Sequence, residues 1–221
     1  MKKFAALRLP ACVLAATVAM NGCANMDQKT QSAGVGAAVG CAAGAVLAKL
    51  TKNDATTACV AGAVVGGLIG YQRARSSEID DAKAASEAAV TVSGASAAPV
   101  QTEPVQVTDK QTGKTETVRA FKSVSVDIPI SQLDTADGKE AMRKLNDYAR
   151  KVARERGEPV QMTIATAPGK AAKAAQAAHQ LQVSEKVGDG VVNRSIVTDT
   201  RIPSNVQRVS IEANNPAKIS V

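Results

Sequence analysis

The sequence predicts an α+β protein, in which an N-terminal helical hairpin precedes a small βαβαββ domain. Three observations predict this arrangement. Glycine recurs at every fourth position in two apolar runs, a stretch rich in Ser, Ala and Pro follows, and the second half of the chain alternates strand-like and helix-like patterns. The first pattern is typical of closely packed helices, and the last indicates a mixed domain with its own core.

Residues 1–22 have the layout of a secretory signal peptide. Three basic residues precede an apolar run that is too short to span a membrane. The segment ends at Gly22-Cys23, which resembles a bacterial lipobox, where the cysteine is acylated and becomes the new N-terminus. Lipidation of Cys23 is therefore expected, and ordinary cleavage with a plain Cys23 thiol is the alternative. Residues 23–31 are polar and are predicted to form a tether.

Two glycine ladders predict a helical hairpin over residues 32–72. On a helix, residues four apart share one face, and glycine there lets a second helix approach closely. Each interior glycine costs about 1 kcal/mol in a water-exposed helix, so the ladders favour packing in or on a membrane. The predicted helices, residues 32–50 and 55–71, are joined by a short polar turn. The ladders consist of Gly36, Gly40 and Gly44, then Gly62, Gly66 and Gly70.

Two cysteines lie within the hairpin, in a compartment that permits disulfides. Pairing the ladders antiparallel separates Cys41 from Cys59 by six helical positions, or about 9 Å along the axis. Disulfides rarely join Cα atoms more than about 7 Å apart. Either Cys41 and Cys59 form a disulfide in another register, or they are buried thiols.

Residues 73–104 are predicted to form a polar helix and then a flexible linker. Arg73 and Arg75 end the apolar run and are expected near lipid headgroups. Residues 78–90 continue as an Ala-rich helix, and residues 91–104 have the composition of a linker.

An α/β domain is predicted over residues 105–213, with a tail at 214–221. Residues 105–119 are interpreted as a β-hairpin with its turn near Gly113. The βαβαββ order follows from period-2 and period-3.6 apolar patterns bounded by Gly and Pro. The predicted elements are a strand at 122–130, a helix at 137–156, a strand at 160–166, an Ala-rich helix up to about residue 187, and strands at 195–201 and 206–213.

The lipobox, the two ladders and the Gly70-Tyr71 exit together resemble the glycine-zipper outer-membrane lipoproteins, including the rickettsial surface-antigen group. The resemblance covers residues 18–75. Ala24 agrees with it, since aspartate at that position commonly marks retention in the inner membrane. The resemblance implies a lipid anchor of the palmitate type on Cys23, in the outer membrane.

The C-terminal half is similar in element order to the OmpA-like domain, which follows the hairpin in some of these lipoproteins and binds peptidoglycan. That family holds diaminopimelate with an aspartate after the second strand and an arginine in the next helix. Here Ala167-Pro168 follows the strand, and residues 157–193 contain no arginine. Losing both charges removes the charge-assisted hydrogen bonds that anchor the ligand. We expect a degenerate OmpA-like domain, or another fold of similar order, that does not bind peptidoglycan through this site.

Composition and motifs disfavour an enzyme or a nucleic-acid-binding protein. The formal net charge of +7 falls to +4 without residues 1–22, and the chain has no Trp and only two Tyr and two Phe. His179 is the only histidine, so no metal or other cofactor is expected. Gly113-Lys114-Thr115 lacks the first glycine of a P-loop, and no nucleophile stands beside a base. The basic surface of helix 137–156 is interpreted as a solvated face, with anionic lipid or peptidoglycan contact as the alternative.

The leading hypothesis is a non-enzymatic outer-membrane lipoprotein with a structural or scaffolding role in the cell envelope. Lipid and the zipper hairpin hold it to the membrane, and the C-terminal domain lies in the periplasm. Membrane lipid and further copies of the chain are the expected partners. One alternative is a module that binds peptidoglycan or an envelope protein. Another is a membrane-active zipper oligomer.

Overall fold

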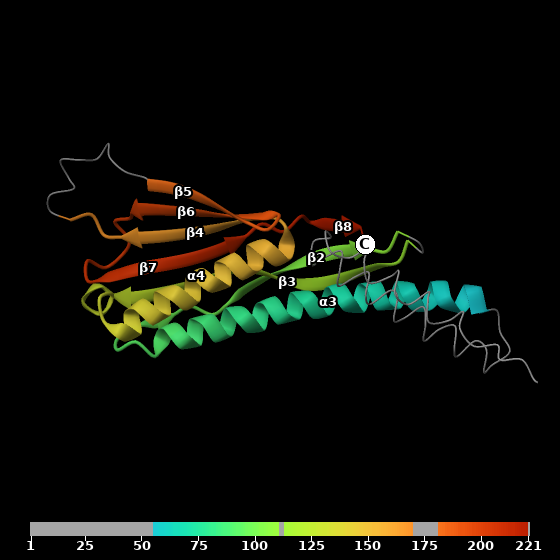
Figure 1. Cartoon of the computed structure of the whole chain (residues 1–221), viewed down its shortest axis with the longest axis horizontal. Coiled ribbons are helices and arrows are strands. Elements are labelled where there is room, and N and C mark those ends of the chain that lie inside the picture. The colour runs from blue at the N-terminus through green and yellow to red at the C-terminus, as the bar shows by residue number, and fades with distance from the viewer. Residues whose placement is uncertain (1–54, 111–112, 170–180, 221) are drawn as a thin grey trace, which may run out of the picture.

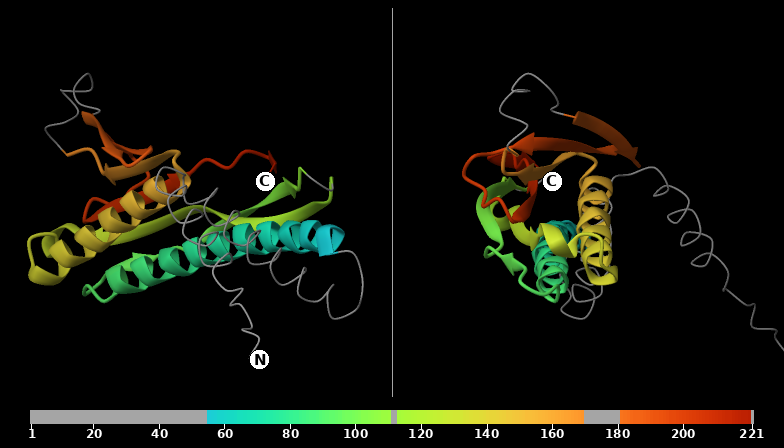
Figure 2. Two further views of the ribbon diagram at one scale, coloured as in Figure 1. Left: turned by 45° about the vertical axis from the view of Figure 1, so that its right-hand side comes forward. Right: turned by 90° about the vertical axis from the view of Figure 1, so that its left-hand side faces the viewer.

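The computed structural model describes residues 55–110, 113–169 and 181–220 (Figure 1). The predicted signal peptide, tether and first zipper helix therefore lie outside the described residues. So do Cys23, Cys41, the first glycine ladder and His179. The described part combines two long helices with one curled mixed sheet, which agrees with the predicted α+β class (Figures 1 and 2).

One continuous helix, α3 (Ala55–Val90), joins the second glycine ladder to the domain. The sequence predicted helix over 55–71 and 78–90, and the structure has no break between them. From residue 68 onward, buried residues recur at alternate intervals of three and four, the period of a helix face that packs along a partner. These buried positions are Leu68, Tyr71, Arg75, Glu78, Ala82, Ala85 and Ala89.

The sheet has the strand order β5-β6-β4-β7-β3-β2-β8, with the short β1 also paired to β3. The pairs β4–β6 and β2–β8 are parallel, and the others are antiparallel. The strands are β1 (Ser96–Ala97), β2 (Gln101–Thr108), β3 (Thr115–Pro129), β4 (Pro159–Thr166), β5 (Leu181–Val187), β6 (Gly190–Thr198), β7 (Val206–Ala213) and β8 (Lys218–Ser220).

The second long helix, α4 (Ala136–Arg156), crosses from β3 to β4 after a short 3-10 turn, η1 (Ile130–Gln132). Thr135 caps its start, because the Gly138 N–H donates to Thr135 Oγ1 at 3.1 Å. Gly157 ends it in the left-handed conformation, with φ 64°. The apolar stripe predicted for this helix is confirmed, since Leu145, Ala149 and Val152 are buried.

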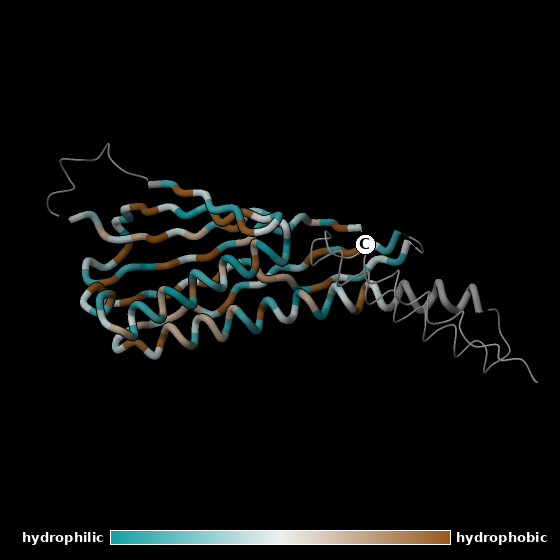
Figure 3. The backbone as a smooth tube through the Cα atoms, viewed as in Figure 1, coloured by the Kyte–Doolittle hydropathy of each residue, from teal (hydrophilic) through white to brown (hydrophobic). Residues whose placement is uncertain are grey.

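The helices and the sheet enclose two clusters of buried residues. The larger lies where α3 and α4 pack on the sheet, and includes Phe121, Leu145, Tyr148 and Ile211. The smaller lies where the start of α3 meets the β2–β3 hairpin, and includes Leu68, Tyr71, Val107 and Val118. Apolar and polar residues alternate along the strands, so one sheet face packs on the helices (Figure 3).

The structure differs from the predicted linker at residues 91–104. β1 and the first half of β2 lie in this segment, and both pair with β3. The sequence predicted a linker here because Pro99 and Pro104 are rarely found inside a strand. Pro104 is tolerated because β8 pairs only with Gln106–Thr108, so β2 has an open edge at Pro104.

A second difference is the strand β5, which lies where the Ala-rich helix was expected to end. Gly188 and Gly190 follow the predicted helix directly, and glycine is typical of a helix end. Instead Val187 pairs with Gly190 across a two-residue turn, and Gly188 has φ 62°. The Ala-rich residues 170–180 lie outside the described residues.

Two further boundaries differ from the prediction. The hairpin strand and the first domain strand form one 15-residue strand, β3. The predicted tail includes β8, which extends the sheet beside β2. The predicted turn near Gly113 is confirmed: the Asp109 N–H donates to the Lys114 carbonyl at 2.8 Å, and Gly113 has φ 69°. Gly113-Lys114-Thr115 is thus part of a hairpin.

Candidate functional site

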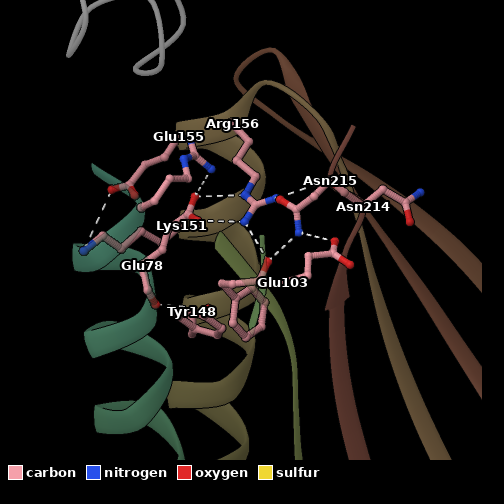
Figure 4. Close-up of polar contacts among 10 residues, drawn as sticks. Glu78, Glu103, Tyr148, Lys151, Glu155, Arg156, Asn214 and Asn215 are labelled. Atoms are coloured by element: carbon pink, nitrogen blue, oxygen red, sulfur yellow. Dashed lines mark hydrogen bonds and ion pairs between the residues drawn. The ribbon is translucent and has the colours of Figure 1, made fainter. Parts of the chain in front are cut away.

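The most chemically distinctive site is a buried ion pair that joins α3 to α4. Glu78 and Arg156 are 1% and 3% exposed, although each carries a charge. The Arg156 Nε donates to Glu78 Oε1 at 2.9 Å, and Nη2 donates to Glu78 Oε2 at 2.7 Å (Figure 4). This two-bond geometry is the strongest form of a carboxylate–guanidinium contact.

The remaining donors of Arg156 bind the sheet and the segment before β8. Nη2 also donates to the Phe121 carbonyl at 3.0 Å, and Nη1 donates to the Asn214 carbonyl at 3.2 Å and to Asn215 Oδ1 at 2.7 Å. An arginine has five N–H groups, and these contacts use all of them. Asn215 in turn donates to Glu103 at 2.7 Å and to the Phe121 carbonyl at 2.8 Å. Arg156 therefore connects α3, α4, β3 and the last residues of the chain.

Arg75 lies on the same face of α3, one turn before Glu78. Its Nη1 donates to Glu78 Oε1 at 2.6 Å, and its guanidinium lies 5.1 Å from the centre of the Tyr71 ring. Arg75 is 3% exposed, so the expectation that it lies among lipid headgroups is wrong. Among the described side chains, its Nε is the buried polar atom that lacks a hydrogen-bond partner.

Tyr148 and Lys151 of α4 complete the contact with α3. The Tyr148 hydroxyl donates to the Glu78 carbonyl at 3.3 Å, and its ring meets Phe121 edge-on at 5.4 Å. Burial raises the pKa of Tyr148, so the phenol stays protonated. Lys151 Nζ lies 2.6 Å from Asp81, whose hydrogen bond raises the pKa of Lys151. These contacts hold α3 in one orientation on α4. We call the contact of Arg75, Glu78 and Asp81 with Tyr148, Lys151 and Arg156 the junction.

The sequence did not point to this junction. Glu78 was interpreted as part of a polar helix, and Arg156 as part of a basic helix surface. The sequence does hold one sign of this burial. Arg75 and Glu78 stand at the three- and four-residue spacing that puts them on the same helix face as Leu68, Tyr71 and Ala82. Arg143 and Lys144 of the basic surface agree with a solvated face, because both are exposed and pair with Glu140.

The structure describes only the second glycine ladder. Gly62, Gly66 and Gly70 lie in α3, and so does Cys59. Gly66 and Gly70 are half-buried, and by helical phase they lie on the side of α3 opposite Tyr71 and Arg75. Packing on the sheet therefore leaves the ladder side of α3 turned away from the domain. The pairing of the two ladders and of Cys41 with Cys59 remains a prediction.

The position at which the OmpA-like family carries its aspartate corresponds to the end of β4. β4 ends at Thr166, and Ala167 and Pro168 follow. The next arginine along the chain, Arg194 of β6, donates to Glu185 at 2.6 Å and to Asn146 at 3.0 Å. Its charge is therefore engaged within the domain.

The described residues, 55–110, 113–169 and 181–220, hold neither a candidate metal site nor a candidate membrane-spanning helix. In those residues, no three His, Cys, Asp or Glu side chains gather closely enough to hold a metal ion. None of the helices described is both long and apolar enough to cross a membrane.

The N-terminal third of the chain is similar to known proteins. The YMGG-like Gly-zipper family matches residues 1–77. Osmotically-inducible lipoprotein B of Salmonella typhimurium is 39% identical over 67 residues, which are 29% of this chain and 88% of that protein. No solved structure is significantly similar to the chain. The chain therefore belongs to the YMGG-like Gly-zipper family and is a glycine-zipper lipoprotein.

Proposed function

We propose that the protein is an outer-membrane lipoprotein with a structural role in the cell envelope. Acyl chains on Cys23 hold it to the membrane, the zipper helices associate through their glycine faces, and the α/β domain stands in the periplasm. The lipobox and the similarity to an osmotically-inducible lipoprotein support the anchor. Several acyl chains hold firmly where a single chain binds only marginally.

One observation carries the structural role: the ladder and the domain core share the helix α3. Its 36 residues extend for about 54 Å, and the Glu78–Arg156 pair locks its second half to the domain. An enzyme on a lipid tether has no need of such a rigid connection. A scaffold does, because the helix fixes the position of the domain relative to the zipper contacts.

Self-association tests the zipper half of this proposal. Gly66→Leu places a large side chain on the ladder side of α3, so we expect smaller oligomers of the acylated chain in detergent, measured by light scattering. The matched control is Ser77→Leu, at an exposed position of the same side beyond the ladder. Unchanged oligomer size in Gly66→Leu would contradict the proposal.

Membrane fractionation tests the anchor half. We expect Cys23→Ser to move the protein from the outer-membrane fraction to the soluble periplasmic fraction. A Cys23→Ser chain that stays with the outer membrane after a salt wash would show that acylation is not the anchor.

A second candidate function is binding to peptidoglycan by an OmpA-like domain. Its support is the topology of the domain. Along the chain, α4 connects β3 to β4, and in the sheet β7 lies between these two strands, antiparallel to both, with β6 on the other side of β4. The missing aspartate and arginine argue against the family's ligand contact. We therefore expect any saturable binding of the Cys23→Ser chain to purified sacculi to use other contacts and to be unaffected by Ala167→Arg. Saturable binding that Ala167→Arg abolishes would overturn this expectation.

A further inference from the structure

The end of the domain nearest the start of α3 carries a surplus of basic side chains. Four exposed cations surround the smaller core cluster: Arg73, Lys110, Arg119 and Lys218. None of the four forms an ion pair with a carboxylate in the described ranges 55–110, 113–169 and 181–220. Of the nearby carboxylates, Glu116 pairs with Lys114 at 2.7 Å, Glu103 lies 3.5 Å from Lys122, and Asp109 is buried.

These cations come from two strands, a turn and a helix that the fold brings to one end. Arg119 of β3 is opposite Pro104 of β2, and Lys218 of β8 is opposite Gln106 of β2. Lys110 lies in the turn of the β2–β3 hairpin, and Arg73 lies on α3. Figures 1 and 2 show this hairpin running alongside the first half of α3. We call these four residues the basic end.

The chain outside the described residues leaves from this same end. The 54 residues that precede α3 carry the lipidation cysteine Cys23, and they enter at Ala55. Leu68 belongs to the same cluster of buried residues as Val107 and Val118, so this part of α3 lies near the level of the hairpin. Lys110 then lies about 10 Å beyond Val107, and α3 extends about 20 Å beyond Leu68. Only about two turns of α3 thus project past the basic end.

We propose that the basic end is the membrane-facing surface of the protein and that its partner is the phosphate layer of anionic phospholipid headgroups. The proposal rests on the lipid anchor proposed above. The exposed polar residues Gln106 and Thr117 pair across β2 and β3 at the level of Lys218, and the cost of burying them in hydrocarbon keeps this level no deeper than the headgroup layer. The lysines and arginines instead gain from the negative surface potential of anionic lipid.

Vesicle binding of the unacylated chain tests the proposal. The full mature chain with Cys23→Ser is mixed with vesicles of phosphatidylcholine alone or with one-third phosphatidylglycerol, and bound protein is measured by flotation. We expect tighter binding to phosphatidylglycerol and weaker binding in salt. The triple variant Lys110→Gln, Arg119→Gln, Lys218→Gln should lose binding by about tenfold or more. A control triple, Lys139→Gln, Arg154→Gln, Lys186→Gln, removes the same charge from exposed sites on α4 and β5.

The outcomes separate the proposal from its alternatives. Loss in the first triple alone supports the basic end as the contact. Equal losses in both triples would show a response to net charge, and equal binding to both lipids would show apolar binding by the ladder; each result overturns the proposal. The anchor is tested separately. If the acylated chain stays in the membrane fraction while the first triple changes nothing, the anchor stands and the headgroup contact falls.

Discussion

At the scale of single residues, Glu78 holds two arginines inside the protein. Removing its charge leaves Arg75 and Arg156 buried without a counter-ion, and breaking such a pair costs about 3–5 kcal/mol. We expect Glu78→Gln to lower the free energy of unfolding by this amount in urea denaturation. Glu140→Gln, which removes an exposed partner of Arg143, should leave the urea midpoint unchanged.

A double variant keeps this prediction testable if Glu78→Gln does not fold. Replacing a buried ion pair with apolar side chains of similar size is often close to neutral. Glu78→Leu together with Arg156→Met should therefore be more stable than Glu78→Leu alone, because Glu78→Leu leaves two buried arginines without a counter-ion and the double variant leaves only Arg75. If the double variant is the less stable one, the cost does not come from an unpaired buried charge.

Asp199 offers a residue-scale prediction of pH dependence. The side-chain hydrogen bond from Arg201 lowers the pKa of Asp199 to about 2, from an ordinary value of 3.8. The contribution of this carboxylate to stability is thus present above pH 3.8 and is lost as pH falls towards 2. An NMR titration of the carboxyl carbon should show the low pKa in the native chain. In Arg201→Gln the pKa should return towards 3.8, and a pKa that stays near 2 would contradict the assigned cause.

At the scale of elements, Gly190 sets the distance between β6 and α4. A Cβ added there would lie 1.9 Å from the Ala153 carbonyl oxygen, which is main chain and cannot rotate away. We expect Gly190→Ala to destabilise the fold by about 1–3 kcal/mol or more in thermal or urea unfolding. Gly169→Ala is the control, because its Cβ would meet nothing within 4 Å. Equal stability of both variants would show that α4 can shift outward without cost.

Local pattern was enough to predict some elements and not others. α4, β4 and β7 each have a clear period and a Gly or Pro boundary, and the structure places them within a residue or two of the prediction. β5 was missed because an Ala-rich run precedes it, and its alternation over Gln182–Val187 covers only a few residues. The strand in 96–104 was missed because its pairing partner lies in β3, and strands supported by distant partners leave a weak local signal.

The candidate site was harder still to predict. Glu78, Arg156 and Asn215 are far apart in sequence and meet only after α3 and α4 pack on the sheet. A buried charged pair has the same sequence pattern as a solvated helix face until its burial is known. The lipobox and the ladders could be predicted because their spacing is local, and the family match supports that reading.

At the scale of the whole molecule, α3 joins the second glycine ladder and the C-terminal domain in one continuous helix. The sequence predicted a flexible linker between them, which would leave residues 91–221 able to fold alone. In the structure, Ala82, Ala85 and Ala89 belong to the larger core cluster with Phe121 and Tyr148. A chain that begins at residue 91 would expose this face of the sheet and leave Arg156 without Glu78.

We therefore expect residues 91–221 not to fold and residues 55–221 to fold. Cooperative urea unfolding, followed by circular dichroism, should appear only in the longer fragment. Adding a synthetic peptide of residues 66–90 should restore cooperativity to the shorter fragment, because the peptide carries Glu78 and the buried alanines. Replacing Glu78 with Gln in the peptide should weaken this rescue, whereas the exposed Ser77→Ala should not. Cooperative folding of residues 91–221 without peptide would show instead that α3 is an appendage. The zipper and the domain would then be two independent units, and the rigid connection proposed for the scaffold would not exist.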